Sequence, residues 1–410
     1  MRATHVTPFI ALALPLGWVA AGCVGEDISA GGLGSAPGCV ATNCATRPET
    51  LELVEPPHER CEGDPAFELI ADLRVESRTG SMAEVSLAPD GTIWILNLTD
   101  SRSQTWVEHY ASDGSLVGAS EGIDLEFEPE VHLAVDAQGR AWIVTHVLLG
   151  ALTPDDAYTE STTLHVYDAD GSPARSLLSL DFIGAAEVAA GSHGGLLVAG
   201  TSLQHAAGGA LLAVAADGET EWVQMLVEGV NLGGDSVRLV SRASGASALL
   251  RQRAFDPNFD ALRYGLARYS PSGALVADAL IGQEFSMSSG RPALTGDDDG
   301  NVILVGVVSG AGTSGLPLSV IRGLPPDGGP GFAWEVTSGG VAAMDRETGT
   351  AYVSTNDGIA AIPRGGARCG IAPLPHDDGT LPPYPYQLAY ASHALYYVEQ
   401  WGFGRWSIVP

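Results

Sequence analysis

Three glutamates at one repeated position are the residues of this chain best placed to do chemistry. Each directly precedes a short β-rich run: Glu84, Glu130 and Glu187. Carboxylate oxygens are the ligands that a hard cation such as Ca²⁺ prefers, and three of them on neighbouring elements could hold one. The same carboxylates could recognise a cationic or sugar-like ligand, or they could be solvated or paired structural residues, which is the favoured interpretation.

The later copies of this position are less acidic. They are occupied by Ser236, Arg291, Gly340 and Gln387. Arg291 would face the three carboxylates from further round a closed arrangement, so we take it as a further binding residue. No cofactor is expected other than a possible Ca²⁺ at the three glutamates.

No complete catalytic motif accompanies these residues. The chain has no Gly-x-Ser-x-Gly elbow, no His-Glu-x-x-His pair and no dinucleotide-binding fingerprint. The acidic stretch from Asp297 to Asn301 contains part of a calcium loop, but it lacks the ligand spacing and the closing Glu, so it predicts a hairpin turn. We therefore assign no catalytic residue.

Two tyrosines in a proline-rich stretch are further binding candidates. Tyr384 and Tyr386 lie near the end of the segment 370–386, which prolines stiffen. Loops carry much of the specificity of repeat folds, and tyrosine is enriched at binding surfaces. We expect both to lie on the side of the three glutamates; the alternative is a spacer between repeats.

A repeated unit of about 50 residues must position all of these side chains. Its first turns close at Gly91, Gly139, Gly194, Gly245, Gly300 and Gly349, with a degenerate copy near His393. Each unit offers four short strands joined by tight turns, and Asp-Gly pairs supply the positive φ angles that such hairpins need. Four-stranded sheets of this period bury both faces by packing around an axis. The sequence predicts an all-β propeller of about seven four-stranded blades.

The two ends of the repeat region indicate how the ring closes. The last unit lacks a fourth strand, whereas the segment 67–75 precedes the first complete unit and has no unit of its own. We expect this N-terminal strand to complete the last blade and so remove a raw edge. Cys61 would then lie beside blade seven and Cys369 on the outer strand of blade six, which predicts a disulfide between them.

The first 60 residues predict export. An apolar run from Phe9 to Val19, too short to cross a bilayer, reads as a secretory signal. The residues Ala20-Ala21-Gly22-Cys23 that follow it resemble the lipobox of bacterial lipoproteins, which implies acylation of Cys23. Val24 after that cysteine favours, by the same resemblance, the outer membrane of the cell envelope.

The sequence thus predicts three segments. These are a lipoprotein signal peptide over residues 1–22, a flexible tether over 23–60 and the propeller over 61–410. An even number of cysteines besides Cys23 predicts two disulfides in an exported chain, and the second pair would be Cys39 with Cys44. Metal binding by these cysteines is the alternative.

Charge limits the partners. The net charge of −29 argues against nucleic acid or an anionic membrane surface, so membrane contact is expected through the lipid anchor only. All 20 basic residues are arginine, which excludes Schiff-base chemistry and the P-loop lysine. A protein, small molecule or glycan remains as the ligand.

The turn sequences carry a family resemblance. Tyr110–Gly114, Tyr167–Gly171 and Tyr269–Gly273 resemble repeats of bacterial extracytoplasmic propellers of the NHL and SBBP type over residues 67–410. Such propellers serve mostly as binding scaffolds and occasionally as enzymes. The resemblance favours a non-enzymatic binding or scaffolding propeller; the alternative is a calcium-dependent lactonase or hydrolase acting at the central channel.

One further stretch, Ala343–Gly349, is similar to a motif of pyrroloquinoline-quinone-type propellers. That motif recurs in every blade of those proteins, whereas here it occurs once, so the cofactor is not expected.

Overall fold

The computed structural model describes most of the chain beyond residue 50. The segments outside the described residues are 1–50, 53–56, 78–79, 100, 126–129, 150–158, 180–182, 192–193, 203–208, 227–236, 255–261, 282–291, 312–316, 330, 376–384 and 400–401. Five residues predicted from the sequence lie within these segments and so outside the described residues: Cys23, Cys39, Cys44, Arg291 and Tyr384. Pro48–Pro410 forms one compact unit. In the described part, no helix is long and apolar enough to cross a membrane.

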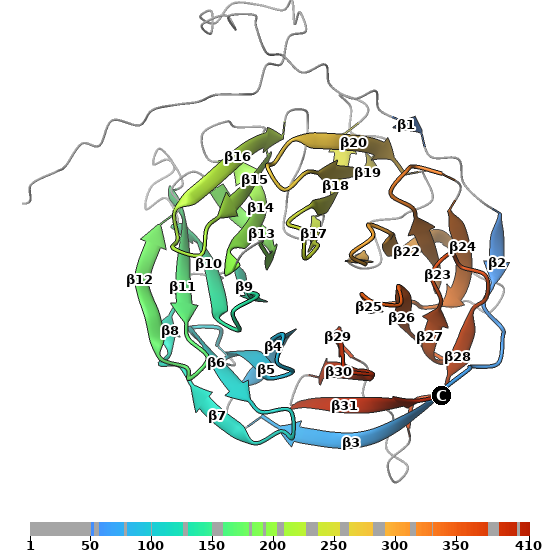
Figure 1. Ribbon diagram of the computed structural model, residues 1–410, viewed down its shortest axis with the longest axis horizontal. Helices are drawn as coiled ribbons and strands as arrows, with labels where there is room; N and C mark the ends of the chain where they lie inside the picture. The colour runs from blue at the N-terminus through green and yellow to red at the C-terminus, as the bar shows by residue number, and fades with distance from the viewer. Residues whose placement is uncertain are drawn as a thin grey trace, which may run out of the picture. The chain divides into compact units, whose positions relative to one another are not determined.

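Seven antiparallel sheets follow one another along the chain and surround a central axis (Figure 1). Blade 1 contains β4 (Ser81–Leu87), β5 (Ile93–Leu98), β6 (Gln104–Tyr110) and β7 (Leu116–Ala119), and β8 (Ile123–Asp124) also pairs with β6. Blade 2 contains β9 (Glu130–Val135), β10 (Ala141–Leu149), β11 (Thr159–Tyr167) and β12 (Pro173–Ser179). Blade 3 contains β13 (Ile183–Ala190), β14 (Leu196–Ser202), β15 (Gly209–Val214) and β16 (Thr220–Leu226).

The remaining blades have the same order from the axis outwards. Blade 4 contains β17 (Arg238–Ser241), β18 (Ser247–Ala254), β19 (Leu262–Tyr269) and β20 (Leu275–Leu280). Blade 5 contains β21 (Ala293–Gly296), β22 (Val302–Ala311), β23 (Pro317–Leu324) and β24 (Phe332–Thr337). Blade 6 contains β25 (Ala342–Asp345), β26 (Thr350–Thr355), β27 (Gly358–Ile362) and β28 (Gly370–Ala372). Blade 7 contains β29 (Gln387–Ala391), β30 (Ala394–Glu399) and β31 (Gly402–Val409).

The core lies between blades, because the second strand of each blade is apolar on both faces. In β5, Ile93 and Ile95 pack against blade 7, whereas Trp94 and Leu96 pack against blade 2. All four side chains are fully buried. Apolar runs that face a neighbouring sheet on each side are what a sheet buried on both faces requires, so burial depends on the complete ring.

The predicted closing strand is confirmed. β3 (Glu68–Glu76) pairs antiparallel with β31, in a register that runs from Glu68 opposite Val409 to Glu76 opposite Gly402. It supplies the outer strand of blade 7, so the prediction of seven four-stranded blades holds. Arg405 of β31 fixes this join by donating to Asp72 of β3 over 2.8 Å.

The segment before β3 belongs to the propeller, contrary to the tether expected up to residue 60. β1 (Leu51–Glu52) pairs in parallel with β20, and β2 (His58–Arg60) pairs in parallel with β24. Gly63 then forms a parallel bridge with Gly370, the first residue of β28. We call β1, β2 and residues 61–64 the strap, because they lie on the outer edges of blades 4, 5 and 6 (Figure 1).

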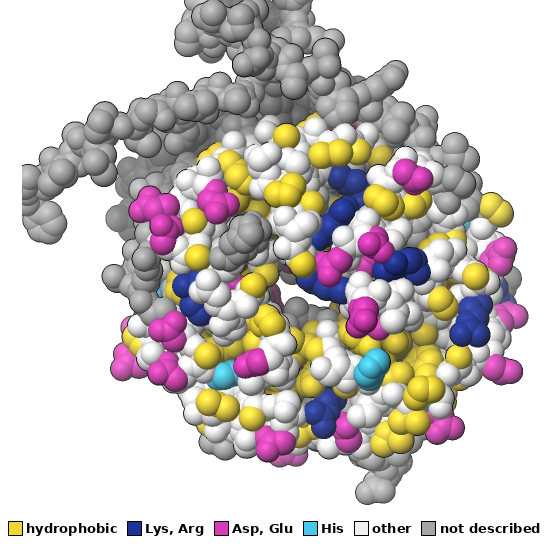
Figure 2. Space-filling view, in the orientation of Figure 1, with side chains coloured by type: hydrophobic (Ala, Val, Ile, Leu, Met, Phe, Trp, Pro, Cys, Tyr) yellow, Lys and Arg dark blue, Asp and Glu magenta, His cyan; other side chains and the backbone are white. Residues whose placement is uncertain are grey.

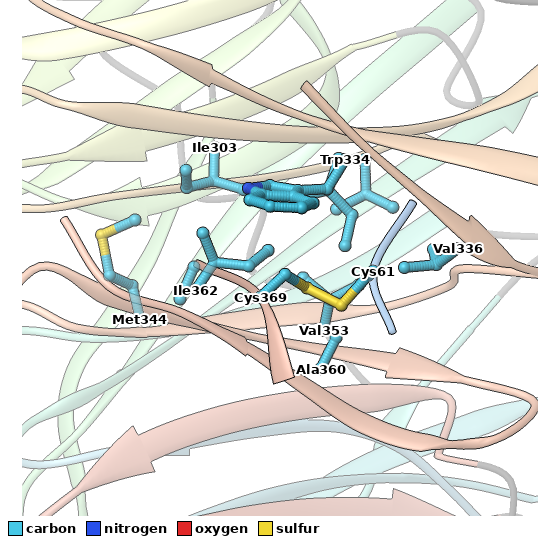
Figure 3. Close-up of a cluster of buried hydrophobic side chains, with 12 residues drawn as sticks. Cys61, Ile303, Trp334, Val336, Met344, Val353, Ala360, Ile362 and Cys369 are labelled. Atoms are coloured by element: carbon cyan, nitrogen blue, oxygen red, sulfur yellow. A yellow bond between two sulfur atoms is a disulfide. The ribbon is translucent and has the colours of Figure 1, made fainter. Parts of the chain in front are cut away.

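A disulfide anchors the strap. Cys61 and Cys369 are bonded with their Cα atoms 5.2 Å apart, which confirms the predicted pair. Its place differs from the expectation, because the Cys61 amide donates to Glu335 O of blade 5 and the bond therefore joins the strap to blade 6. Figure 3 shows the two sulfur atoms among side chains of both blades, including Trp334 and Val353. A disulfide indicates an oxidising, extracytoplasmic compartment.

Candidate functional site

The three predicted glutamates lie on the innermost strands of three successive blades. Glu84 is on β4, Glu130 begins β9 and Glu187 is on β13. All three side chains are partly exposed. The innermost strands surround the central axis, so the three glutamates lie along the central channel.

The register corrects one of the three assignments. Glu84 and Glu187 both lie opposite the fourth residue of the second strand in their blade, Leu96 and Ala199. In blade 2 that place, opposite Val144, belongs to His132, and Glu130 lies two residues further from the turn, opposite His146. The start of an apolar run does not mark the same register position in every blade, so the sequence pattern placed Glu130 with Glu84 and Glu187.

Counting back seven residues from each turn glycine would have found the right set. In blades 1 to 6 that offset gives Glu84, His132, Glu187, Arg238, Ala293 and Ala342. Gln387 is opposite Val398 and reaches the same level in blade 7, where the first hairpin is tighter. We call the polar members, Gln387, Glu84, His132, Glu187 and Arg238, the mouth ring. His132 and Arg238 are the members that the sequence analysis missed.

The members of the mouth ring contact neighbouring blades. Gln387 Oε1 accepts the amide hydrogen of Val85, and Glu84 Oε2 accepts that of Leu133 at 2.6 Å. Val85 and Leu133 are equivalent residues of β4 and β9. The two interactions therefore repeat one arrangement at the junctions of blade 7 with blade 1 and of blade 1 with blade 2.

Arg238 joins blades 3, 4 and 5 within the mouth ring, through one ion pair and one hydrogen bond. Arg238 Nη1 lies 3.3 Å from Glu187 Oε2, and Arg238 Nε donates to Pro292 O at 2.8 Å. The Arg238 side chain is only 14% exposed, so this ion pair is better shielded from water than a surface pair. A hydrogen bond to a charged group contributes about 1.5–3 kcal/mol, so Arg238 helps to hold three blades together.

His132 is the titratable centre of the mouth ring. Its Nδ1 lies 3.4 Å from Glu84 Oε1, while its buried Nε2 has no hydrogen-bond partner. Burial alone would lower the pKa of His132, but the hydrogen bond to Glu84 and the charges of Glu84, Glu187 and Glu130 together raise the pKa above its usual value. The imidazole therefore keeps its proton to a higher pH than a free histidine does.

The carboxylates of the mouth ring are engaged within the protein, and its charged side chains alternate in sign. Within the described residues, no three His, Cys, Asp or Glu side chains are grouped so that they could hold a metal ion. Both oxygens of Glu84 already face donors from blade 2. The ring instead presents acidic and basic side chains in alternation over four blades, and such a surface suits a polar ligand with groups of both signs.

Of the two predicted tyrosines, the structure describes Tyr386. Its side chain is 60% exposed, and its amide donates to Val398 O at 2.9 Å, directly before Gln387 of the mouth ring. An exposed tyrosine next to a polar ring adds a flat apolar contact to that surface. Tyr386 directly precedes Gln387, the first residue of β29.

Comparisons with known proteins show similarity at the level of fold. No protein-family model and no curated protein matches the chain. Hydrazine synthase from Kuenenia stuttgartiensis matches with a TM-score of 0.53 and 12% identity, over 80% of this chain and 94% of that one. The β-propeller domain of the Trilobed protease from Pyrococcus furiosus matches with a TM-score of 0.49 and 7% identity, over 81% and 94%.

A protein of unknown function from Dyadobacter fermentans matches with a TM-score of 0.44 and 13% identity, over 84% of this chain and 99% of that one. At these identities the similarity extends to the propeller fold alone, because one fold supports many unrelated activities.

Proposed function

We propose that this protein is a non-enzymatic binding propeller of the cell envelope, held by a lipid on Cys23, and that the mouth ring with Glu130 and Tyr386 forms its binding face. The observation that carries the proposal is the alternation of Glu84, His132, Glu187 and Arg238 over four blades. Contacts between blades fix these side chains before any ligand arrives, and pre-organised groups lose little entropy on binding.

Charge complementarity narrows the ligand class. The body carries a net charge of −29, so a strongly anionic partner is disfavoured and nucleic acid is excluded from the proposal. A protein surface or small molecule with both cationic and acceptor groups fits the ring. The lipobox resemblance and the Cys61–Cys369 disulfide both support an envelope location.

Site-specific photocrosslinking in intact cells tests the binding face. A benzophenone amino acid is placed at Tyr386 or, as the control, at Val276, which is equally exposed (60%) but lies on the outer strand β20. We expect a discrete adduct from position 386 that weakens in a Glu130→Gln background, and none from position 276. Equal labelling at both positions would contradict the proposed face.

A second experiment separates binding from calcium-dependent catalysis. The melting temperature is measured with and without Ca²⁺ in the wild type and in Glu130→Gln. We expect no calcium-dependent rise, because Glu84 is already engaged by blade 2. A rise that disappears in Glu130→Gln would support the metal-dependent enzyme instead. Loss of membrane fractionation in Cys23→Ser tests the anchor separately.

A further inference from the structure

A cavity of about 530 Å³ lies between blades 6 and 7. We call it the seam cavity, because both the segment that precedes the closing strand and the end of β31 line it. Asp345 of its wall is the last residue of β25, whereas each member of the mouth ring lies three or four residues before the last residue of its innermost strand. The seam cavity is therefore displaced from the mouth ring toward the end of the ring at which the innermost strands finish, and its size is within the range of about 300–1,000 Å³ that small-molecule sites occupy.

Aromatic rings form much of its wall. Tyr352 and Tyr390 are stacked with ring centroids 5.4 Å apart and planes 9° apart, and Phe67 meets Tyr352 edge-on at 5.9 Å. Tyr352 and Phe67 are buried, and Ala361 and Ile408 complete an apolar surface around them. Figure 2 shows hydrophobic side chains gathered over the part of the ring that contains β25 to β31.

The carboxylate in the wall is already satisfied. Asp345 Oδ2 accepts hydrogen bonds from Thr348 Oγ1 at 2.7 Å and from Tyr390 Oη at 3.0 Å, and its Oδ1 accepts the amide hydrogens of Glu347 and Thr348. Burial would raise the pKa of Asp345, but the hydrogen bonds from Thr348 and Tyr390 hold it below the usual value. Asp345 is thus an ionised, fully bonded anchor for Tyr390 and not a group waiting for a cation.

Neutral hydroxyls and a balanced rim complete the lining. Burial, together with the charge of Asp345, raises the pKa of Tyr352 to about 12, so its hydroxyl is a neutral donor at any physiological pH. Thr350 adds another hydroxyl. At the exposed rim, Asp64 and Arg368 present one charge of each sign.

This lining selects among ligand classes. The opposite charges of Asp64 and Arg368 at the rim favour neither a cation nor an anion, and the net charge of −29 disfavours a strongly anionic ligand. A wholly apolar ligand would cover the Tyr352 hydroxyl without offering it a hydrogen-bond partner, which costs about 1–3 kcal/mol. A neutral molecule with one apolar face and several hydroxyls satisfies both the aromatic rings and the hydroxyls.

We propose that the seam cavity binds a neutral sugar ring, its C–H face against the aromatic wall and its hydroxyls toward Tyr352, Thr350 and the rim. The proposal does not depend on the mouth ring or on the proposed function, because it concerns residues outside the mouth ring. It assigns the protein a second binding site.

The experiment uses the exported protein and saturation-transfer NMR with four neutral sugars, namely glucose, galactose, N-acetylglucosamine and cellobiose. We expect at least one to bind with a millimolar dissociation constant. Tyr352→Phe keeps the aromatic stack but removes the hydroxyl, and we expect it to weaken binding roughly fivefold, the effect of one lost hydrogen bond. Ala361→Phe fills the cavity and should abolish binding.

Tyr386→Phe, which removes an equivalent hydroxyl outside the seam cavity, is the control and should bind as the wild type does. Thermal melting verifies that each variant is folded. If none of the four sugars binds, or if binding survives in both Tyr352→Phe and Ala361→Phe, the proposal is wrong. Tighter binding of glucuronate than of glucose would likewise overturn the neutral class.

Discussion

The outer edges of the seven blades fall into two groups. In blades 4 to 6 the N-terminal segment adds to them, with β1 on β20, β2 on β24 and Gly63 beside Gly370, and in blade 7 it supplies the outermost strand, β3 on β31. In blades 1 to 3 the outermost strands are β7, β12 and β16, and no further strand joins them among the residues that the structure describes. One segment thus ties together four neighbouring blades.

The difference indicates which side of the ring the N-terminal segment stabilises. An open sheet edge invites pairing with another chain, and covering it removes that hazard. Blades 1 to 3 instead end in short or partly polar strands, although Leu116, Val117 and Val223 remain exposed there. The N-terminal segment that joins blades 4 to 7 also carries the disulfide and the closing strand, so we expect stability to be concentrated on that side.

The largest effect should follow from removing the closing strand. Deleting residues 1–76 takes away β1, β2 and β3, which leaves the outer edge of β31 without a partner and exposes the core around Trp406. We expect no cooperative thermal transition in this variant. Deleting residues 1–47 should leave the melting temperature unchanged, and deleting residues 1–60 should lower it without preventing folding.

If the variants that lack residues 1–60 and 1–76 are equally stable, then β3 does not close the ring in solution. Circular dichroism at the β-sheet minimum, followed with temperature, distinguishes the three proteins.

The next largest effect concerns the disulfide of the strap. Cys61→Ser should lower the free energy of unfolding by about 2–5 kcal/mol, because the bond closes a loop with a sequence separation of 308 residues. Urea unfolding of the exported protein measures the change. Cys44→Ser is the control, since its position lies before the propeller, and it should leave the unfolding midpoint where it is.

Non-reducing peptide mapping gives an independent check on the same bond. A peptide that joins Cys369 to Cys39 or Cys44 would contradict the arrangement of the strap on blades 5 and 6.

Much of the structure of blades 4 to 7 could be predicted from the sequence. Asp-Gly turns at a period near 50 residues fix the hairpins, and the apolar second strands require a neighbour on each face. The unpaired segment 67–75 and the incomplete last unit then leave β3 and β31 as partners. The Cys61–Cys369 pair followed from the same placement of the closing strand.

The strap itself could not be predicted. β1 has two residues and β2 has three, which is too short for any alternation of polar and apolar side chains to appear. Their pairing depends on the outer edges of β20 and β24, which exist only after blades 4 and 5 have folded. A proline- and glutamate-rich segment therefore looked like a tether although part of it adds to two sheets.

The mouth ring was half predictable. Glu84 and Glu187 were found because they precede apolar runs, but His132 lies within such a run and Arg238 begins β17 directly. The turn glycine, not the start of the apolar run, fixes the register of the first hairpin. An alignment on the glycines therefore recovers both missing residues.

A moderate effect is expected at the mouth ring, because its members join blades of both groups, 1 to 3 and 4 to 7. Arg238→Met should lower the free energy of unfolding by about 1–3 kcal/mol, because Arg238 links Glu187 of blade 3 to Pro292 at the start of blade 5. Arg60→Met removes an exposed ion pair of the strap, Arg60 with Glu62, and should change the free energy of unfolding by less than about 1 kcal/mol. Equal changes in the free energy of unfolding for Arg238→Met and Arg60→Met would show that Arg238 does not hold the blades together.

The smallest expected effect is a dependence on pH at His132, which lies where blades 1 and 2 meet. The folded protein holds the His132 proton more tightly than an unfolded chain, whose imidazole has a pKa of 6.5, because Glu84, Glu130 and Glu187 face it and outweigh its burial. The stabilisation is therefore fully present below pH 6.5 and is lost as pH rises through the higher pKa of the folded state. Urea unfolding from about pH 5 to pH 8 measures it.

In His132→Gln this part of the pH dependence should be absent, so the difference between wild type and variant shrinks as pH rises. Glu84→Gln is the matched variant, because the glutamine can still accept the Leu133 amide hydrogen while the charge that raises the His132 pKa is removed. It should move the loss of stability to lower pH without abolishing it. A difference between wild type and His132→Gln that stays constant over this range would mean that His132 is already neutral, and that blades 1 and 2 are joined by the Glu84–Leu133 hydrogen bond alone.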